Sequence, residues 1–345
     1  MTQGLPPQKR IQAFSDLGIL IKNLDAEEKA LLFRRASNQN SWFTDISMEA
    51  ALSGLAELLD VENLKEWLVS YSIPERNNPK KVGILMAGNI PGVGFHDLMC
   101  VLISGNIAVV KLSSSDSIFS KWLIDRLIQL EPLFEEYIQI QEMLKGMDAY
   151  IATGSDNSAR YFNYYFGKYP SIIRANRTSV GVLTGEETDD EIEQLGKDIF
   201  LYFGLGCRNV SKIYVKDPEQ LQRLFGILER FSWVAQNHKY LNNYEYNKSI
   251  YLVNGDPHLD NGFLLLKESS ELVSPIAVLF YEVYESREDL KGKLDVSSPK
   301  IQCIVGDPNV VPQAVGFGRA QYPKPWDYAD GVDTMKFLLG LNQDN

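Results

Sequence analysis

The stretch that decides the fold is Val82-Gly-Ile-Leu-Met-Ala-Gly-Asn-Ile-Pro-Gly-Val-Gly94. Its apolar start predicts a β-strand, its glycines and proline predict a turn, and a helix is expected to begin near Phe95. A strand that leads through a turn into a helix is the opening of a βαβ unit. Asn89 stands at the carboxyl end of the predicted strand, where α/β proteins place their sites. Its amide could donate to an oxyanion, or it could only stabilise the turn.

The sequence after Lys81 repeats this alternation of a predicted strand and a predicted helix. Further β-rich runs are separated by longer stretches with a helical pattern, which predicts βαβ units and a largely parallel sheet. Two polar segments, 237–248 and 255–262, are interpreted as substrate-side insertions or as surface connections. The predicted strands cover residues 82–86, 107–111, 149–152, 180–183, 212–215, 249–253, 276–280 and 301–305.

The first 75 residues are predicted to be helical. Apolar residues recur at helical spacing from Ile11 to Leu24. Asp25 and Glu28 together predict a capping box for the next helix. Asp60 predicts the N-cap of the last helix in this region.

Composition and charge exclude several classes of function. The chain has 345 residues, 45% of them hydrophobic, which is enough for one large domain or two. A net charge of −11 argues against nucleic acid or an anionic membrane as the main partner. Cysteines 100, 207 and 303 are far apart, so neither a disulfide framework nor a zinc knuckle is predicted. The sequence contains no signal-peptide pattern and no apolar run of about 18 residues, so we expect a reduced, cytoplasmic protein without membrane insertion.

One cysteine follows two glycines in the run Tyr202-Phe-Gly-Leu-Gly-Cys-Arg-Asn-Val-Ser-Lys-Ile-Tyr-Val215. Gly204 and Gly206 permit backbone conformations and close approaches that a side chain would forbid. A thiol on such a turn beside Arg208 has the access and the nearby positive charge that a nucleophile needs. Cys207 is therefore a candidate nucleophile, although a cysteine in a core commonly serves as a small hydrophobic residue.

Two more strand ends carry residues suited to a nucleotide. Lys111 is followed by serines at 113–115, which suits hydroxyl or phosphate binding, or alternatively a solvated lysine with serine helix caps. Gly154 and Ser155 open a helix whose N–H groups could hold a pyrophosphate, unless Ser155 is an ordinary N-cap. The dinucleotide fingerprint G-x-G-x-x-G is absent from the sequence, so phosphates must be held in another way.

In this order the motifs resemble the aldehyde dehydrogenase superfamily, and within it the acyl-CoA reductase branch, the reductase of bacterial bioluminescence. The resemblance covers roughly residues 40–340, and the runs 203–212 and 318–334 look typical of the branch. The matching residues are Asn89 and Pro91, Gly105 and Asn106 with Val109, Val110 and Lys111, Gly154 and Ser155, Gly204 and Cys207, and Glu271 with Pro275.

The resemblance implies an aldehyde-dehydrogenase-like α/β fold of two domains with largely parallel sheets. We expect a helical N-terminal region at 1–78 packed on a cofactor domain at 79–178, and a catalytic domain at 179–315. Residues 316–345 would return to the cleft or to an oligomer interface. The implied roles are Cys207 as nucleophile, Asn89 and the Cys207 N–H as oxyanion donors, Lys111, Ser113 and Ser114 on the adenosine ribose, Gly154 and Ser155 on the pyrophosphate, and Glu271 on the nicotinamide ribose.

One departure from the superfamily bears on the reaction. Members that hydrolyse their thioester carry a glutamate base in a Glu-Leu-Gly-Gly setting, whereas the corresponding stretch here is Ile173-Arg-Ala-Asn-Arg177. Without that base a thioester should survive long enough to exchange with coenzyme A. Arg174 and Arg177 could favour an anionic substrate, or they could be structural.

Together these features predict reduction of an acyl-CoA, with a fatty acyl group, to the aldehyde through an acyl-cysteine intermediate. The expected cofactor is NADPH, with NADH as the alternative, because Ser114 stands where NAD-preferring members tend to carry a glutamate; Asp116 could instead reach the ribose. The alternatives are a CoA-acylating aldehyde dehydrogenase working in the oxidative direction, and a non-catalytic relative that binds nucleotide or acyl groups. We expect a homo-oligomer, and a protein that donates acyl groups or accepts the aldehyde is a candidate partner.

No metal site is predicted. Asp256, His258 and Asp260 alternate as potential ligands but lack a clear third partner in a chain with three histidines. The aspartates at 327, 330 and 333 do not follow the EF-hand spacing and are expected to order a turn.

Overall fold

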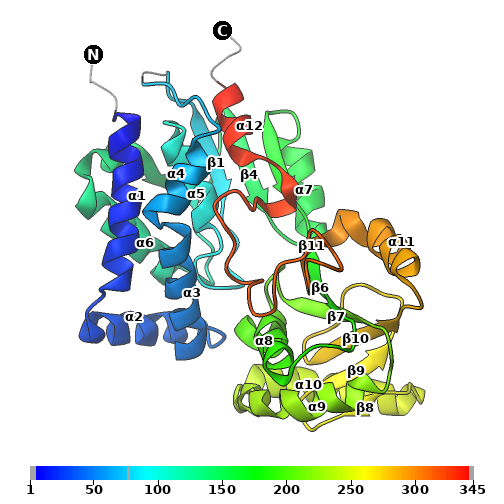
Figure 1. The fold of residues 1–345 in the computed structure, drawn as a ribbon. Helices are drawn as coiled ribbons and strands as arrows, with labels where there is room; N and C mark the ends of the chain where they lie inside the picture. Colours follow the sequence, from blue (N-terminus) through cyan, green and yellow to red (C-terminus); the bar gives the residue numbers. More distant parts are fainter. Residues whose placement is uncertain (1–4, 76–77, 342–345) are drawn as a thin grey trace. The chain divides into compact units, whose positions relative to one another are not determined.

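Two sheets, each with its own helices, organise the chain (Figure 1). The computed structural model describes residues 5–75 and 78–341. One compact unit contains the residues up to Asn176 together with those from Tyr322, and the second unit is Arg177–Gln321. Most neighbouring strands run parallel in both sheets, which confirms the prediction from the alternation of strands and helices.

The first unit is built on a five-stranded sheet in the order β3-β2-β1-β4-β5, and every neighbouring pair is parallel. The chain moves outward from β1 to β2 and β3, and then continues on the other side of β1 with β4 and β5. The strand order therefore reverses between β1 and β4, which is where open α/β sheets place their ligand sites. The strands are β1 (Lys81–Leu85), β2 (Ile107–Lys111), β3 (Ile138–Ile140), β4 (Ala149–Thr153) and β5 (Ser171–Arg174).

Helices cover both faces of this sheet. In Figure 1, α5 (Phe95–Ile103) and α6 (Ser117–Leu130) lie on one face, and α7 (Asp156–Phe166) lies on the other. Every residue of α5 except His96 is buried, because α1 and α12 pack on this helix from outside. An α-helix that is apolar on all sides is expected at such a position in the core.

Four helices precede the sheet, as the sequence predicted: α1 (Pro7–Lys22), α2 (Ala26–Gln39), α3 (Asp45–Leu58) and α4 (Val61–Leu68). Asp60 caps α4 by accepting a hydrogen bond from the N–H of Glu62, as expected. Asp25 caps α2, but the expected capping box with Glu28 does not form. The carboxylate of Glu28 instead accepts from Trp122 Nε1 at 3.1 Å and pairs with Arg126, because α6 packs against α2.

The second unit contains a six-stranded sheet in the order β11-β6-β7-β10-β9-β8, in which only the short edge strand β8 is antiparallel to its neighbour among the strands described. Helices α8 (Asp189–Phe200), α9 (Gln220–Leu228) and α10 (His238–Asn254) lie on one side of it and α11 (Arg287–Ser297) on the other (Figure 1). The strands are β6 (Thr178–Leu183), β7 (Val210–Val215), β8 (Leu259–Asp260), β9 (Leu265–Glu268), β10 (Val278–Val283) and β11 (Ile301–Val305).

The strand expected at 249–253 is wrong, and the segment 237–248, interpreted as a substrate-side insertion or a surface connection, is helical. Both segments belong to α10, which Asn237 caps by accepting hydrogen bonds from the N–H groups of Lys239 and Tyr240. Gly255 ends the helix with a φ of 69°, in the left-handed region. A helical face of buried residues, Tyr240, Tyr244, Asn247 and Tyr251, explains the outcome, since burial of this face overrides the local β propensity of 249–253.

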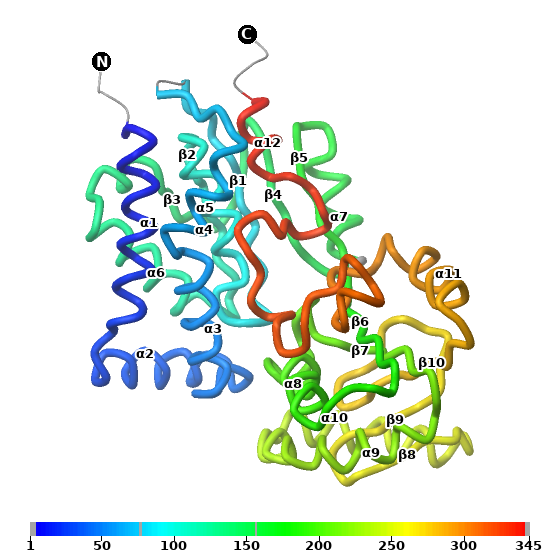
Figure 2. Tube along the Cα trace, in the orientation of Figure 1, coloured from blue at the N-terminus to red at the C-terminus, as the bar shows by residue number. Residues whose placement is uncertain are grey.

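The end of the chain returns to the first unit. Helix α12 (Thr334–Gly340) packs on α5, as the red end of the tube in Figure 2 shows. The hydroxyl of Tyr328 accepts a hydrogen bond from Trp67 Nε1 at 2.7 Å and lies 2.8 Å from the hydroxyl of Tyr71. Asp333 caps α12, and Asp327 accepts a hydrogen bond from the N–H of Lys324 at 2.8 Å, so two of the three late aspartates order local backbone. None of the helices in the described ranges has the length and apolar character needed to cross a bilayer.

Candidate active site

Three of the predicted segments meet at the carboxyl edge of the first sheet. β1 is flanked by β2 and β4, and Leu85 at its end is paired with Lys111. The loop with Asn89 follows β1, the serine segment follows β2, and Gly154 with Ser155 follows β4. Because the strands are parallel, these loops emerge side by side at the point where the strand order reverses.

The loop after β1 is held in place by a buried carboxylate. Asp116 is 1% exposed, and its Oδ2 accepts hydrogen bonds from the N–H of Gly92 at 3.0 Å and from Ser120 Oγ at 2.9 Å. Gly92 has a φ of 70°, which favours glycine at this position. Burial raises the pKa of Asp116 to about 7, against the effect of the two hydrogen bonds. The alternative in which Asp116 reaches a ribose is therefore wrong, since this side chain points into the core.

The loops after β1 and β2 are in direct contact. A Cβ atom on Gly88 would lie 2.4 Å from Ser113 Oγ, so only glycine fits between them. Ser113 also accepts a hydrogen bond from the N–H of Ser115 at 3.3 Å. Lys111 and Ser114 are exposed. A cationic side chain and a hydroxyl are thus available beside the Asn89 loop.

Ser155 caps α7, as one of the two interpretations of this residue expected. Its hydroxyl accepts a hydrogen bond from the N–H of Ser158 at 3.2 Å. Gly154 is tightly packed, because a Cβ atom there would lie 2.8 Å from Phe162 and from Ser158. The capping role is compatible with an anion at the same end, where the first N–H groups of the helix point outward.

Arg174 is structural, which settles one of the alternatives left open by the sequence. It is 3% exposed at the end of β5, and its Nη1 donates to Asp97 Oδ2 of α5 at 2.6 Å. Its Nη2 donates to Thr334 Oγ1 at 3.0 Å. Arg174 therefore links the sheet to α5 and α12. Arg177 begins the second unit and donates from Nη1 to the carbonyl of Ile301 at 3.3 Å.

In the second unit, Cys207 lies on the loop between α8 and β7. Tyr202, Phe203 and Gly204 all have positive φ angles, of 56°, 57° and 77°. Two consecutive non-glycine residues in this region are uncommon and indicate a backbone held under strain by its surroundings. The carbonyl of Cys207 accepts a hydrogen bond from Ser179 Oγ of β6 at 3.0 Å. The turn that glycines 204 and 206 predicted is confirmed.

Asn209 is the residue that the sequence analysis missed at this loop. It is 2% exposed, and its Oδ1 accepts from the N–H of Gly206 at 2.8 Å. Its Nδ2 donates to three carbonyls at the end of α8, those of Asp198, Ile199 and Leu201, at 3.1, 3.3 and 2.6 Å. The last carbonyl groups of a helix have no hydrogen-bond donor within the helix, and the Asn209 amide supplies one. The same side chain also fixes the turn before Cys207 through its bond to Gly206. The signal in the sequence was a polar residue directly before the apolar start of β7.

The structure separates Cys207 from the other two cysteines. Cys207 is partly exposed, whereas Cys100 and Cys303 are buried. Burial raises the pKa of the Cys100 thiol well above its usual value, which disfavours the reactive thiolate. Accessibility therefore singles out Cys207 among the three.

Glu271 lies at the same end of the second sheet as Cys207. Ser211, near the start of β7, donates from its hydroxyl to the carbonyl of Leu272 at 2.9 Å. This bond brings the segment with Glu271 next to the strand that follows the cysteine loop. The side chain of Glu271 is exposed, as a ligand-binding carboxylate would need to be.

Asp256, His258 and Asp260 each have a partner within the protein. The carboxylates of Asp256 and Asp260 pair with Lys267 and Lys248 at 2.9 and 2.6 Å. The Nδ1 atom of His258 lies 2.8 Å from the carbonyl of Asp256.

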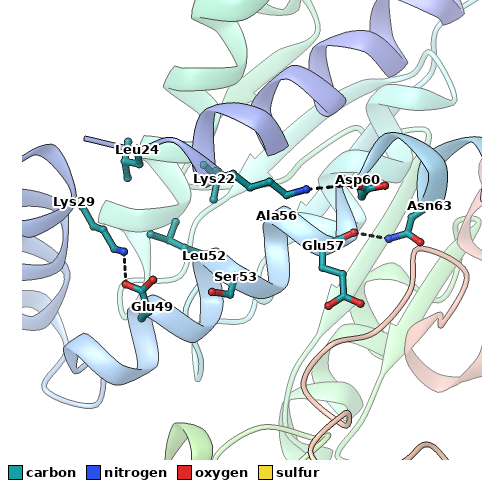
Figure 3. Close-up of a pocket in the computed structure, with 11 residues that line it drawn as sticks. Lys22, Leu24, Lys29, Glu49, Leu52, Ser53, Ala56, Glu57, Asp60 and Asn63 are labelled. Atoms are coloured by element: carbon teal, nitrogen blue, oxygen red, sulfur yellow. Dashed lines mark hydrogen bonds and ion pairs between the residues drawn. The ribbon is translucent and has the colours of Figure 1, made fainter. Parts of the chain in front are cut away.

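A hollow of about 420 Å³ lies among the N-terminal helices (Figure 3). Its rim carries the ion pairs Lys22–Asp60 and Lys29–Glu49, at 3.2 and 2.5 Å. Leu52 and Ala56 of α3 contribute apolar surface. Glu57 of the lining pairs with Lys324 at 3.0 Å, and none of the lining residues is a candidate site residue.

Comparison with known proteins identifies the family. The family described as "Acyl-CoA reductase (LuxC)" matches residues 20–230, which is more than half of the chain. The chain belongs to this family. A curated relative, the long-chain acyl-protein thioester reductase of Aliivibrio fischeri, is 23% identical over 176 residues, covering 46% of this chain and 36% of the relative. The match thus spans about a third of that relative's length.

Solved structures confirm the fold. The chain is similar to aldehyde dehydrogenase 21 from Physcomitrella patens in complex with succinate, with a TM-score of 0.69 and 13% identity over 99% of this chain and 85% of the other. It is also similar to an indole-3-acetaldehyde dehydrogenase in complex with NAD+, with a TM-score of 0.63 and 13% identity over 90% and 76% of the two chains. The aldehyde-dehydrogenase-like α/β fold implied by the motifs is therefore confirmed.

Proposed function

We propose that this protein reduces an acyl thioester to the aldehyde with a nicotinamide cofactor, through an acyl intermediate on Cys207. The observation that carries the proposal is the presentation of Cys207. In a chain of the acyl-CoA reductase family, this partly exposed cysteine lies on a strained turn. Hydrogen bonds between the side chains of Asn209 and Ser179 and the backbone of Gly206 and Cys207 fix this turn. A rigid, accessible thiol is what covalent catalysis requires.

In the proposed mechanism, the Cys207 thiolate attacks the acyl carbonyl and the donor thiol leaves, so the enzyme carries a thioester. The Asn89 amide and the Cys207 N–H donate to the oxyanion that forms at each addition. The bound nicotinamide cofactor would supply the hydride. Collapse of the resulting tetrahedral oxyanion releases the aldehyde and restores the Cys207 thiolate.

The residues at the carboxyl edge of the first sheet fit such a cofactor. Lys111 and Ser114 are exposed there, and Gly88 contacts Ser113 directly, with no room for a side chain between them. We assign Lys111, Ser113 and Ser114 to the adenosine ribose. Gly154 and Ser155 at the start of α7 are assigned to the pyrophosphate, where the helix dipole favours negative charge. In the second unit, Glu271 is assigned to the nicotinamide ribose.

The absence of a carboxylate in 173–177 favours thiol exchange over hydrolysis. Arg174 in this stretch is buried in its pair with Asp97, so it cannot activate water. The thioester on Cys207 should then persist until it is reduced. We assign acyl-CoA as the donor, with a fatty acyl group; the name of the Aliivibrio fischeri relative points to an acyl-protein as a second source. The expected homo-oligomer and a protein that donates acyl groups or accepts the aldehyde remain parts of this proposal.

The test is a reductase assay at the absorbance band of the reduced nicotinamide. We expect acyl-CoAs of increasing chain length to oxidise NADPH, with stoichiometric aldehyde and coenzyme A as products. Parallel reactions with an acyl group on a carrier protein distinguish the two acyl sources. If no thioester of either kind oxidises reduced nicotinamide, while the protein binds nucleotide, the non-catalytic alternative replaces this proposal.

Cofactor preference provides a second prediction. Ser114 leaves Lys111 without a competing anion, and one charge-assisted contact to a 2′-phosphate contributes about 1.5–3 kcal/mol. We therefore expect a preference for NADPH over NADH of about ten- to hundredfold in kcat/KM. Ser114→Glu should shift this preference toward NADH, because a carboxylate there would repel the phosphate and bind the 2′-hydroxyl.

A matched control for this prediction is Ser70→Glu, which adds the same charge at an exposed serine after α4. The control should keep the wild-type preference. Equal or better use of NADH by the wild type would contradict the assignment of Lys111 and Ser114.

A further inference from the structure

The segment Gly316-Phe-Gly-Arg-Ala-Gln321 near the end of the second unit has no role in the mechanism above. Residues 316–321 form a segment that we call the strap. It begins beside β11, where Val315 donates its N–H to the carbonyl of Ile304 at 2.8 Å and accepts from the N–H of Gly306 at 3.0 Å. It ends at Gln321, the last residue of this unit.

A single buried carboxylate on α8 anchors the strap. Asp198 is 1% exposed, and its two oxygens accept hydrogen bonds from the N–H groups of Gly318 at 2.6 Å and Ala320 at 3.0 Å. Gly318 has a φ of 78°, and a Cβ atom there would lie 2.7 Å from Gln194 Oε1, one turn earlier on α8. The strap backbone therefore lies directly on the last turns of the helix that leads to Cys207.

The strap also contacts the cysteine loop. The carbonyl of Ala320 accepts a hydrogen bond from Nη1 of Arg208, the residue that follows Cys207, at 3.4 Å. Asn209 in turn donates to the backbone carbonyl of Asp198 at 3.1 Å. The Asp198 carboxylate thus binds the strap, and the strap binds Arg208. The next residue, Asn209, binds the Asp198 carbonyl, so these contacts form a closed circuit. Cys207 precedes Arg208 in the chain and therefore lies directly beside this circuit.

We propose that Asp198 is a positioning residue for Cys207: it fixes the strap so that the Ala320 carbonyl holds the guanidinium of Arg208, the residue that follows Cys207. The proposal rests on Cys207 being the nucleophile of the proposed function. Fixing a long arginine side chain costs conformational entropy. The hydrogen bond to the rigid Ala320 carbonyl offsets part of that cost. The positive charge held there favours the thiolate.

The direct charge of Asp198 would act in the opposite direction. A nearby anion disfavours a thiolate, so simple removal of the carboxylate should make Cys207 more reactive. Burial raises the pKa of Asp198 to about 7, against the hydrogen bonds from Gly318 and Ala320 and the nearby charges of Lys197 and Arg319. Loss of the Asp198 carboxylate should therefore lower the reactivity of Cys207 if Asp198 acts by positioning, and raise it if Asp198 acts by its charge. The sign of the change separates the two effects.

The experiment measures alkylation of Cys207 by iodoacetamide at pH 7, followed by mass spectrometry of its peptide. Asp198→Asn turns one acceptor into a donor that faces an N–H of the strap, so the strap should detach from α8. We expect alkylation to slow by about three- to tenfold, the effect of a rise of up to one unit in the thiol pKa. The difference in alkylation rate between the wild type and Asp198→Asn should become smaller at about pH 9.5, above the ordinary thiol pKa of about 8.5. The reason is that the substitution changes the ionisation of the Cys207 thiol and not its accessibility.

Arg208→Gln should slow alkylation to a similar extent. Adding Asp198→Asn to Arg208→Gln should then slow it no further, because both changes remove the same effect. The matched control is Asp189→Asn, at the exposed start of the same helix, where the carboxylate pairs with Arg223. It should leave the alkylation rate unchanged.

Three outcomes would overturn the proposal: faster alkylation of Asp198→Asn, an unchanged rate in a folded variant, or an additive loss in the double variant. Should Asp198→Asn fail to fold, Asp198→Glu takes its place; it keeps the charge but moves both acceptors by one methylene, and the same slowing is expected. The measurement uses neither thioester nor cofactor. Failure of the reductase assay and failure of this coupling are therefore distinguishable.

Discussion

Cys207→Ala is expected to abolish thioester reduction while the protein remains folded and still binds nucleotide. The reaction needs a thiolate to carry the acyl group, and alanine offers no nucleophile. Incubation of the wild type with an acyl-CoA and no nicotinamide should acylate Cys207, seen as a mass shift on its peptide. The same incubation should leave the Cys207→Ala protein unmodified.

Cys303→Ala is the matched control for this substitution, because Cys303 is a buried cysteine in β11 of the same unit. It should retain reductase activity and become acylated at Cys207. Acylation confined to Cys100 or Cys303, or full activity of Cys207→Ala, would remove Cys207 from the mechanism.

Asn209→Ala should produce the largest loss of stability among single changes at this loop, about 3 kcal/mol in the free energy of unfolding. The substitution leaves the Gly206 N–H and three carbonyls at the end of α8 without their amide partner. Each buried polar group that loses its partner lowers the free energy of unfolding by about 1–3 kcal/mol. Water that enters the space left by the side chain should bind some of the four groups, which limits the total loss. Urea unfolding followed by circular dichroism measures the change.

Asn243→Ala provides the comparison, since its side chain makes one exposed hydrogen bond, to the carbonyl of Lys239 on α10. Its effect should stay within about 0.5 kcal/mol. Asn209→Ala should also reduce the reductase rate, because the turn before Cys207 loses its anchor. A loss of stability no larger than that of Asn243→Ala would show that Asn209 does not hold the loop.

Local patterns in the sequence were sufficient for most elements of the fold. The strands expected at 107–111 and 301–305 have those same bounds in the structure, and the Asp60 cap was found as expected. These features depend on residues close together in the chain, namely apolar runs between turn residues and a side chain next to its own helix. Strands β3, β5, β8 and β9 escaped prediction, and they are the shortest strands of the two sheets, with two to four residues each, which is too little to carry a clear pattern.

The candidate site was accessible from the sequence only in part. Cys207 and the strand-end residues were named because strand–turn–helix order places such residues at known edges of a sheet. The residues that support the site were not found in this way, because Asp116 and Asp198 accept hydrogen bonds from backbone groups that are distant in the sequence. Asp198, for example, binds the N–H of Gly318 across 120 positions of sequence.

The sequence by itself determined the parallel α/β architecture, the turn that presents Cys207 and the family to which the chain belongs. Periodicity, glycine placement and motif order carry that information along the chain. Only the tertiary structure decided that 249–253 is helical, that Arg174 is a buried partner of Asp97, and that Asp116 faces the core. In each case the outcome depends on burial against residues distant in the chain, and the free energy of that burial exceeds the local preference.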